Sequence, residues 1–260
     1  MLLGSHVSRA TALDDALACD ADVIQVFLSA PQTWSAPKAR GDEAALVSSG
    51  TALFVHAPYL VNPASLNPEV RAKSKLALEA QAAAAHAIGA RGLIVHGGHP
   101  TGSGTVSDGI SGWLEVLDGW QGATPLLIEN TAGGNAAVAR RFDAFAQLID
   151  ALRSQGHNVG VCLDTCHAHA GGEGLAGVVE RLVAFAGAID FMHVNDSKDG
   201  FDSGRDRHEN LGRGQCAIDE LIAAVQAADC PSVVETPNGL QAQAADVALL
   251  RSSLGVQRVS

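Results

Sequence analysis

Residues 159–167 read VGVCLDTCH, a short apolar run that ends in Asp164 and is followed closely by His167. A run of this length and composition is typical of a strand buried on both faces. Similar runs lie at residues 2–7, 23–28, 52–57, 92–97, 125–130, 159–164, 189–194 and 232–236. Ala-rich segments separate them, and this alternation is typical of βα units around a parallel sheet.

The segments between the runs carry Ala, Leu and charged residues at helical spacing, most clearly at residues 69–88, 140–154, 175–185 and 218–228. Eight such units in 260 residues match the size of one (β/α)8 barrel, or TIM barrel. A doubly wound open sheet has the same local pattern, but the Gly-x-Gly-x-x-Gly motif expected after its first strand is missing. We therefore predict an α/β fold with a single TIM-barrel domain over residues 1–260.

The composition restricts the class of protein. A hydrophobic fraction of 47% with 17% charged residues excludes a disordered chain. No run reaches about 18 apolar residues and no basic leader precedes one, so we expect a soluble, cytoplasmic protein with no membrane partner. A formal net charge of −11 argues against nonspecific coating of nucleic acid, because phosphate neutralisation needs a basic surface. Any nucleic-acid site must therefore be local.

Six consecutive apolar runs end in a side chain that can bind a metal ion. These residues are His56, His96, Glu129, Asp164, His193 and Glu235. The parallel strands of a barrel bring their carboxyl ends to one face, so the six side chains should meet there. Isolated buried carboxylates and imidazoles are strongly unfavourable, whereas metal coordination compensates them. The strand ends therefore predict a metal site at the C-terminal face of the barrel.

Three more candidate ligands lie just beyond the strand ends. His167 follows Asp164 by three residues, and Asp206 and His208 lie in the Gly-rich segment 195–214. The full set then holds five His, two Asp and two Glu. Nine ligands are too many for one tetrahedral zinc ion, but they suit three metal ions that share a bridging carboxylate and also bind water.

The remaining histidines and the cysteines have plainer interpretations. His6 and His99 fall at the same face, where they could orient metal ligands. The five cysteines are odd in number and widely spread, which is typical of reduced thiols. A zinc site that uses Cys162 and Cys166 is conceivable, but no second Cys pair completes it.

Nearly from end to end, the sequence resembles the endonuclease IV family of apurinic/apyrimidinic endonucleases. The blocks that carry the resemblance are GSHV at 4–7, HAPYLVN at 56–62, VHGGH at 95–99, IENTAG at 128–133, LDTCH at 163–167, MHVNDSK at 192–198, DRH at 206–208, NLG at 210–212 and ET at 235–236. The resemblance implies three zinc ions, with Mn²⁺ as an alternative at one site. It implies that the first ion is held by His56, His96 and Glu129, the second by Glu129, Asp164, His193 and Glu235, and the third by His167, Asp206 and His208.

The activity implied by the resemblance is hydrolysis of duplex DNA on the 5′ side of an abasic site, leaving a 3′-hydroxyl. Removal of 3′ blocking groups and a monomeric state are also implied, with Glu129 and Glu235 as catalytic residues. Paired divalent ions suit this chemistry because they can activate water and stabilise the phosphate during in-line displacement.

The resemblance also implies contacts with DNA that contains abasic sites or 3′-blocked ends. The residues concerned are Tyr59, Leu60, Gln32, Asn62 and Arg207. Tyr59 and Leu60 would probe the base stack, which is least costly to open where a base is absent. The alternative for Tyr59 is packing on the barrel rim. Gln32 departs from the family, whose members commonly have Arg there, and this affects one DNA contact.

Positive charge is expected near the site, because eight of the 17 Lys and Arg residues lie in or beside the predicted loops of this face. They are Lys38, Arg40, Arg140, Arg141, Lys198, Arg205, Arg207 and Arg213.

Two other functions fit parts of the sequence. A metal-dependent sugar isomerase or epimerase of the xylose isomerase type would share the barrel but need fewer ligands. The additional set of His167, Asp206 and His208 argues against it, because an isomerase would not use a third metal site. A catalytically inactive binder of damaged DNA, or a metal-stabilised scaffold, would be expected to lack a ligand, and none is missing.

Overall fold

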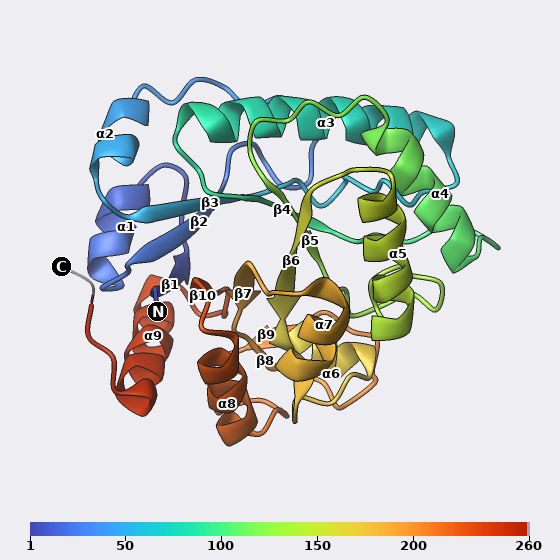
Figure 1. The fold of residues 1–260 in the computed structure, drawn as a ribbon. Coiled ribbons are helices and arrows are strands. Elements are labelled where there is room, and N and C mark those ends of the chain that lie inside the picture. Colours follow the sequence, from blue (N-terminus) through green and yellow to red (C-terminus); the bar gives the residue numbers. More distant parts are fainter. Residues whose placement is uncertain (259–260) are drawn as a thin grey trace.

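A computed structural model describes residues 1–258 of the protein. Its barrel strands are β1 (Leu3–His6), β2 (Val23–Phe27), β3 (Ala52–His56), β4 (Leu93–His96), β5 (Leu126–Glu129), β6 (Val159–Asp164), β7 (Phe191–His193) and β10 (Ser232–Val234). All neighbouring strands are parallel, and the order β1-β10-β7-β6-β5-β4-β3-β2 closes on itself. Helices surround this ring of strands (Figure 1). The predicted TIM barrel is therefore confirmed.

Helices follow the strands along the chain. They are α1 (Ala12–Ala18), α2 (Glu43–Ser48), α3 (Pro68–Ala87), α4 (Val106–Leu117), α5 (Phe142–Ser154), α6 (Thr165–Gly171), α7 (Val178–Ala186), α8 (Ile218–Ala228) and α9 (Leu240–Leu254). The predicted helix at residues 175–185 begins only at Val178, because Gly177 precedes it with a φ of 65°. None of the helices within residues 1–258 is long and apolar enough to cross a membrane.

Apolar side chains fill the inside of the barrel. Phe54 and Phe191 stack there with ring centroids 4.1 Å apart, among Ile94, Leu127 and Val233. A second and larger apolar cluster packs the strands against the helices. Because the interior is filled, the strands form a rigid support, and polar side chains at their carboxyl ends lie on top of a packed core.

The Gly-rich segment 195–214 is more ordered than a plain loop. It contains a two-stranded antiparallel hairpin of β8 (Asp196–Ser197) and β9 (His208–Glu209). The Asp196 carboxylate accepts hydrogen bonds from the backbone N–H groups of Gly214 (2.8 Å) and Cys216 (2.9 Å), which closes the base of the segment. His208 therefore lies on a strand instead of a free loop.

Candidate metal centre

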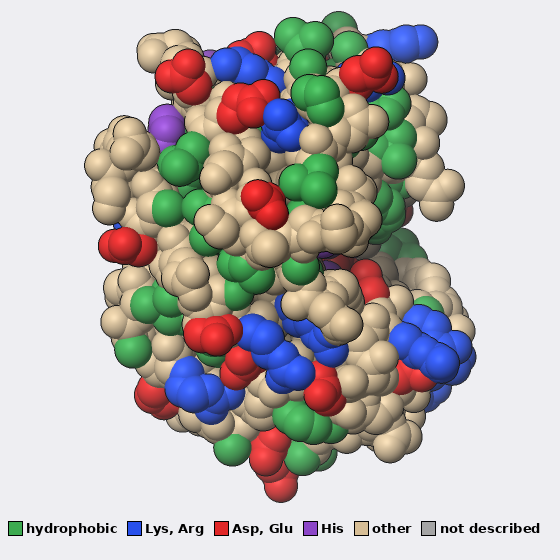
Figure 2. Space-filling view, turned by 90° about the vertical axis from the view of Figure 1, so that its right-hand side faces the viewer, with side chains coloured by type: hydrophobic (Ala, Val, Ile, Leu, Met, Phe, Trp, Pro, Cys, Tyr) green, Lys and Arg blue, Asp and Glu red, His purple; other side chains and the backbone are tan. Residues whose placement is uncertain are grey.

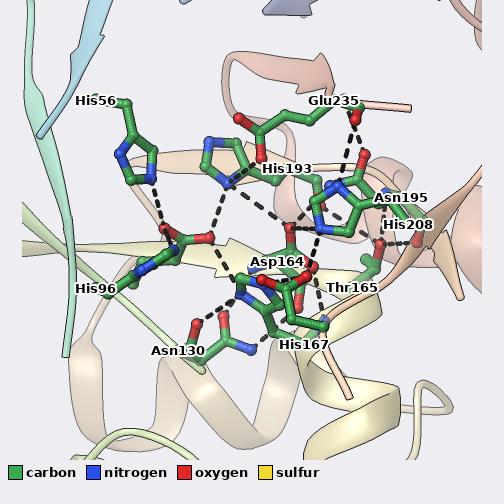
Figure 3. A network of polar contacts seen from close by, with 12 residues as sticks. His56, His96, Asn130, Asp164, Thr165, His167, His193, Asn195, His208 and Glu235 are labelled. Carbon is green, nitrogen blue, oxygen red and sulfur yellow. Dashed lines mark hydrogen bonds and ion pairs between the residues drawn. The ribbon is translucent and has the colours of Figure 1, made fainter. Parts of the chain in front are cut away.

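The six residues predicted at strand ends lie close together. Figure 3 shows His56, His96, Asp164, His193 and Glu235 directed toward a common centre. Five of them are the last residues of β3 to β7, and the sixth, Glu235, directly follows β10. The strand register places His96 opposite Glu129 and Asp164 opposite His193. The sheet pairing alone therefore brings neighbouring ligands side by side.

Among the described residues, the nine predicted ligands fall into three groups whose donor atoms lie within 4.8 Å of one another. The groups are His56, His96 and Glu129; Glu129, Asp164, His193 and Glu235; and His167, Asp206 and His208. Glu129 belongs to two of them. The structure thus brings together every residue that the sequence singled out as a ligand.

The two oxygens of Glu129 face different groups. Its Oε2 lies 3.1 Å from His56 Nε2 and 3.3 Å from His96 Nε2, while its Oε1 lies 2.9 Å from His193 Nδ1. In a tetrahedral site with zinc about 2.0–2.1 Å from each ligand, the ligand atoms would be roughly 3.3 Å apart. The spacing around Glu129 is therefore close to that of a coordination shell.

The third group shows a similar spacing. Asp206 Oδ1 lies 3.1 Å from His167 Nε2 and 3.2 Å from His208 Nε2. His208 Nε2 is buried and faces the carboxylates of Asp206 and Asp164, yet it makes no hydrogen bond of regular geometry in the described part of the chain. A cation between this nitrogen and the carboxylates would satisfy all three groups. The residues of this group therefore fit a metal ion.

Hydrogen bonds orient the imidazole rings toward the centre. Nδ1 of His56 lies 2.7 Å from the Ala57 carbonyl oxygen, and Nδ1 of His167 lies 2.9 Å from that of Asn130. A carbonyl oxygen only accepts, so these nitrogens donate, and when either ring is neutral its lone pair is on Nε2. His208 Nδ1 faces a backbone carbonyl in the same way at 3.3 Å. Such outer contacts are typical of metal-binding histidines.

Asp164 connects the second and third groups. It is the N-cap of α6, where its Oδ1 accepts a hydrogen bond from the His167 backbone N–H at 2.7 Å. This cap begins the helix immediately after β6 and places His167 in its first turn. Its Oδ2 accepts from Asn195 Nδ2 at 2.8 Å and lies 3.6 Å from His208 Nε2. One carboxylate thus starts a helix and faces the metal centre.

Two residues that hold the ligands in place were missed by sequence reasoning. Gln25 on β2 is fully buried and contacts both His193 and Glu235. Asn195 donates to Asp164 and accepts from the Glu235 backbone N–H at 2.8 Å. The sequence did contain a signal for Gln25, because it is a polar residue within the apolar run 23–28 and a buried polar group requires hydrogen-bond partners.

The mutual approach of carboxylates and imidazoles shifts their pKa values. Burial alone would raise the pKa of Glu129, but His193 and His96 outweigh it and hold that pKa well below its usual value. Burial would lower the pKa of His193, but Glu235 and Glu129 outweigh it and raise that pKa to about 9. The centre therefore favours positive charge between its carboxylates, and protons compete there with metal ions.

His96 behaves differently. Burial lowers the pKa of His96 to about 4, so its imidazole is neutral at pH 7 and its lone pair is free to bind a metal.

All five cysteines are free, as predicted, and they are buried. Burial raises the pKa of Cys166 to about 12 and that of Cys162 well above its usual value. Cys162 lies within reach of Glu129 and His193, and Cys166 within reach of Asp164 and His208, so the two cysteines do not share one ligand group in the described part of the chain and the Cys162–Cys166 alternative is disfavoured.

Tyr59 and Leu60 lie at the mouth of the centre and are 51% and 37% exposed. The Tyr59 ring is nearly parallel to that of His96, with centroids 5.8 Å apart, and meets Phe27 edge-on at 5.2 Å. Tyr59 and Leu60 line an open pocket of about 670 Å³ that His96 and Asp206 also line. Both residues are thus exposed beside the ligands, and their contact with DNA stays a prediction.

The other predicted DNA contacts, Asn62, Gln32 and Arg207, differ in their exposure and in their partners within the protein. Asn62 uses its amide within the protein, donating to the His99 carbonyl at 2.8 Å and accepting from the His99 N–H at 3.2 Å. Gln32 is exposed, and Arg207 is half-exposed and paired with Asp199. Asn62 therefore holds two loops together, whatever it does toward DNA.

His6 and His99 were both candidates for orienting ligands. His6 Nδ1 lies 2.7 Å from Glu235 Oε1, which is a contact of the predicted kind. His99 is exposed and, through its backbone, bonds to Asn62.

Acidic residues partly neutralise the predicted positive charge. Asp199 pairs with Arg205 at 3.5 Å and accepts from Arg207 Nε at 2.6 Å. Asp202 likewise accepts from two arginines, Arg140 at 2.9 Å and Arg141 at 2.8 Å. Figure 2 shows Lys and Arg side chains interleaved with Asp and Glu in the lower half of the visible face. The net positive charge around the site is therefore smaller than the count of basic residues suggests.

Known proteins share both the sequence and the fold. Residues 13–253 match the family described as xylose isomerase-like TIM barrel. A protein named probable endonuclease 4 from Mycobacterium tuberculosis is 48% identical over 255 residues, which cover 98% of this chain and the whole of that protein. The crystal structure of endonuclease IV from Thermus thermophilus superposes with a TM-score of 0.83 at 29% identity, covering 98% of this chain and 99% of that one.

The barrel by itself is not specific to nucleases. A D-tagatose 3-epimerase-like protein has a TM-score of 0.76 over 98% of this chain and 97% of its own, but only 17% identity, so the likeness shows the fold alone. The near full-length identity to endonuclease 4 proteins is the more specific finding. The chain belongs to the xylose isomerase-like TIM barrel family and, within it, to the endonuclease IV family.

Proposed function

We propose that this chain is a DNA repair endonuclease that hydrolyses the phosphodiester bond 5′ to an abasic site in duplex DNA, leaving a 3′-hydroxyl. It would also remove 3′ blocking groups, and would act as a monomer with a single catalytic domain. The observation that carries the proposal is the set of three neighbouring ligand groups, two of which share Glu129. The family membership supports it, because the relatives are named endonuclease 4.

The donor set suits zinc, which binds imidazole and carboxylate in four-coordinate sites. Each of the three groups would hold one ion, and Mn²⁺ could replace zinc in one of them. When bound, such ions lower the pKa of water and neutralise charge on a phosphate.

Glu129 and Glu235 are the catalytic residues of this proposal. Glu129 faces two groups through separate oxygens, so its negative charge would stabilise a cation in each of them. Glu235 is 14% exposed and its Oε2 faces His193 Nδ1 at 3.3 Å. A substrate phosphate can therefore approach Glu235 from the open side, while Glu129 stays buried beneath.

Recognition of the lesion would use the exposed rim. Tyr59 and Leu60 present apolar surface beside the ligands, where they could enter a base stack. Unstacking costs a few kcal/mol and is least costly where a base is already absent. Gln32, Asn62 and Arg207 would contact the DNA around this position.

A sugar isomerase, the alternative function, would use fewer of the candidate metal ligands. An isomerase would need only metal-binding carboxylates and imidazoles of the kind in the second group. The third group, with His167, Asp206 and His208, would then have no function, although its atoms are arranged as closely as the others. The endonuclease accounts for all three groups.

The test combines metal analysis with mapping of the cut. The purified protein is analysed for zinc and manganese, then incubated with an end-labelled duplex that carries one abasic site and with the same duplex carrying a normal base. We expect about three ions per chain and a single cut 5′ to the lesion, with a 3′-hydroxyl that a polymerase can extend. One ion per chain, a cut on the 3′ side, or equal cutting of both duplexes would contradict the proposal.

A further inference from the structure

Two barrel strands, β1 and β2, contribute no ligand to the three groups. They contribute His6 and Gln25 instead, which the strand register places side by side. Gln25 is fully buried in the middle of an otherwise apolar strand. A buried amide must find hydrogen-bond partners, and two of the partners of Gln25, Glu235 and His193, are metal-ligand candidates.

The two ends of the Gln25 amide meet different partners. Its Nε2 lies 2.7 Å from Glu235 Oε1 and 2.9 Å from His6 Nδ1, and its Oε1 lies 2.7 Å from His193 Nε2. A carboxylate oxygen only accepts, so the NH₂ end must face Glu235. The carbonyl end then faces His193 and can only accept. The orientation of the amide is therefore determined by the charge of Glu235.

This orientation determines the tautomer of His193. Because Gln25 Oε1 accepts, His193 Nε2 must carry a hydrogen, and the lone pair of the neutral ring is on Nδ1. Nδ1 is the atom that faces the second group, 2.9 Å from Glu129 Oε1 and 3.3 Å from Glu235 Oε2. A single amide thus directs the lone pair of His193 into the centre.

The same contacts assign separate tasks to the two oxygens of Glu235. Oε1 accepts a hydrogen bond from Gln25 and lies 2.7 Å from His6 Nδ1, which itself lies 2.9 Å from Gln25 Nε2. Oε2 remains directed at His193 Nδ1. Glu235 is therefore held so that one oxygen, Oε2, is presented to the centre.

We infer that Gln25 is a positioning residue that couples Glu235 to His193: it holds one oxygen of the carboxylate and sets the tautomer of the imidazole, so that both ligands face one metal ion. The inference rests on the proposed metal centre. Strands β1 and β2 would then orient ligands instead of supplying them. The oriented ligands are His193 at the end of β7 and Glu235 after β10.

The test compares three variants of similar shape. Gln25→Met removes the contacts of the amide with Glu235, His193 and His6. His6→Phe removes the contacts of one imidazole with Glu235 and Gln25 but leaves the bond between Gln25 and His193 in place, and Gln81→Met is the matched control. Gln81 is a buried glutamine of α3 whose amide donates to Ser29 Oγ at 2.9 Å, away from the ligands. Each protein is checked for folding by circular dichroism and thermal unfolding.

The main readout is metal retention, measured as the transfer of zinc to a chromogenic chelator, with the visible spectrum of the cobalt-loaded protein as a second readout. We expect Gln25→Met to lose affinity for one ion of the set by about 10- to 100-fold. His6→Phe should lose less, and Gln81→Met should match the wild type. On abasic duplex, Gln25→Met should lower kcat with little change in KM, because the rim is unaltered.

Unchanged transfer of every ion in folded Gln25→Met, or a loss no larger than in Gln81→Met, would overturn the inference. An equal loss of all ions would also overturn it, because it would indicate general destabilisation. If the wild type itself bound one ion or none, or failed to cut abasic duplex, the proposed function would fail and this inference with it. Wild-type metal binding and cutting with an unaffected Gln25→Met would defeat the inference alone.

Discussion

The buried floor and the exposed rim of the candidate metal centre are held by different parts of the fold. At the floor, Glu129, Asp164 and His193 are fully buried, each at the end of a barrel strand. At the rim, Tyr59 and Leu60 are 51% and 37% exposed on the loop after β3. Strand ends over a packed core hold side chains rigidly, whereas loops can adapt to a ligand. The comparison suggests that chemistry and recognition can be altered separately.

The largest effect is expected from Glu129→Gln, because this floor residue joins two ligand groups. The amide loses the negative charge that faces His56, His96 and His193, so two metal positions weaken together. Cleavage of abasic duplex should fall by orders of magnitude, and the metal content should fall by more than one ion per chain. Both are measured on the same preparation.

The matched control for this change is Glu115→Gln on α4, where the carboxylate is exposed and pairs with Arg71. Exposed pairs contribute at most about 1 kcal/mol, so this variant should cut like the wild type. Wild-type turnover in Glu129→Gln would show that the buried carboxylate is only structural.

A smaller but general loss is expected from His208→Ala, which opens the third group while leaving Glu129 in place. Because His208 is a ligand candidate and not part of the exposed rim, internal abasic cleavage and removal of a 3′-phosphate should fall together. Metal analysis should show a loss close to one ion per chain. A loss confined to one of the two reactions would assign His208 to recognition and break the division between floor and rim.

Tyr59→Ala should have a selective effect, because Tyr59 belongs to the rim. An internal abasic site requires bending and turning out of the sugar, whereas a 3′-terminal phosphate at a frayed end needs less distortion. Internal cleavage should therefore slow much more than 3′-phosphate removal, with metal content unchanged. Both rates are measured on matched duplexes at fixed salt.

Phe201→Ala is the control for this prediction, since Phe201 is 56% exposed but does not line the pocket. It should change neither rate. Equal slowing of both reactions in Tyr59→Ala, or no slowing, would show that Tyr59 only packs on the rim against Phe27.

The smallest effect is expected from Arg207→Gln. Arg207 is already paired with Asp199, so a phosphate would gain less from it than from a free arginine. Binding of abasic duplex should weaken slightly, and the slope of log K against log salt should decrease in magnitude by no more than about 1. A larger change would show that the pair opens completely when DNA binds.

Much of the barrel and of its ligand set was predictable from the sequence. Apolar runs of six residues or so, each followed by a helical segment, indicate a parallel barrel because burial on both faces demands them. The same topology explains why residues as distant as His56 and Glu235 could be grouped from their positions at strand ends. Little tertiary detail was needed for this step, since parallel strands share the direction of their carboxyl ends.

Other features depended on contacts that only the folded chain creates. The role of Gln25 follows from two bonds to residues 168 and 210 positions away, and no local pattern shows which way an amide turns. Asn62 fits a DNA contact in the sequence, yet in the fold it bonds to His99. The pairing of Arg207 with Asp199 likewise arises within a hairpin that its Gly-rich sequence did not reveal. Strand periodicity is local, but side-chain hydrogen bonds are set by the packing of distant segments.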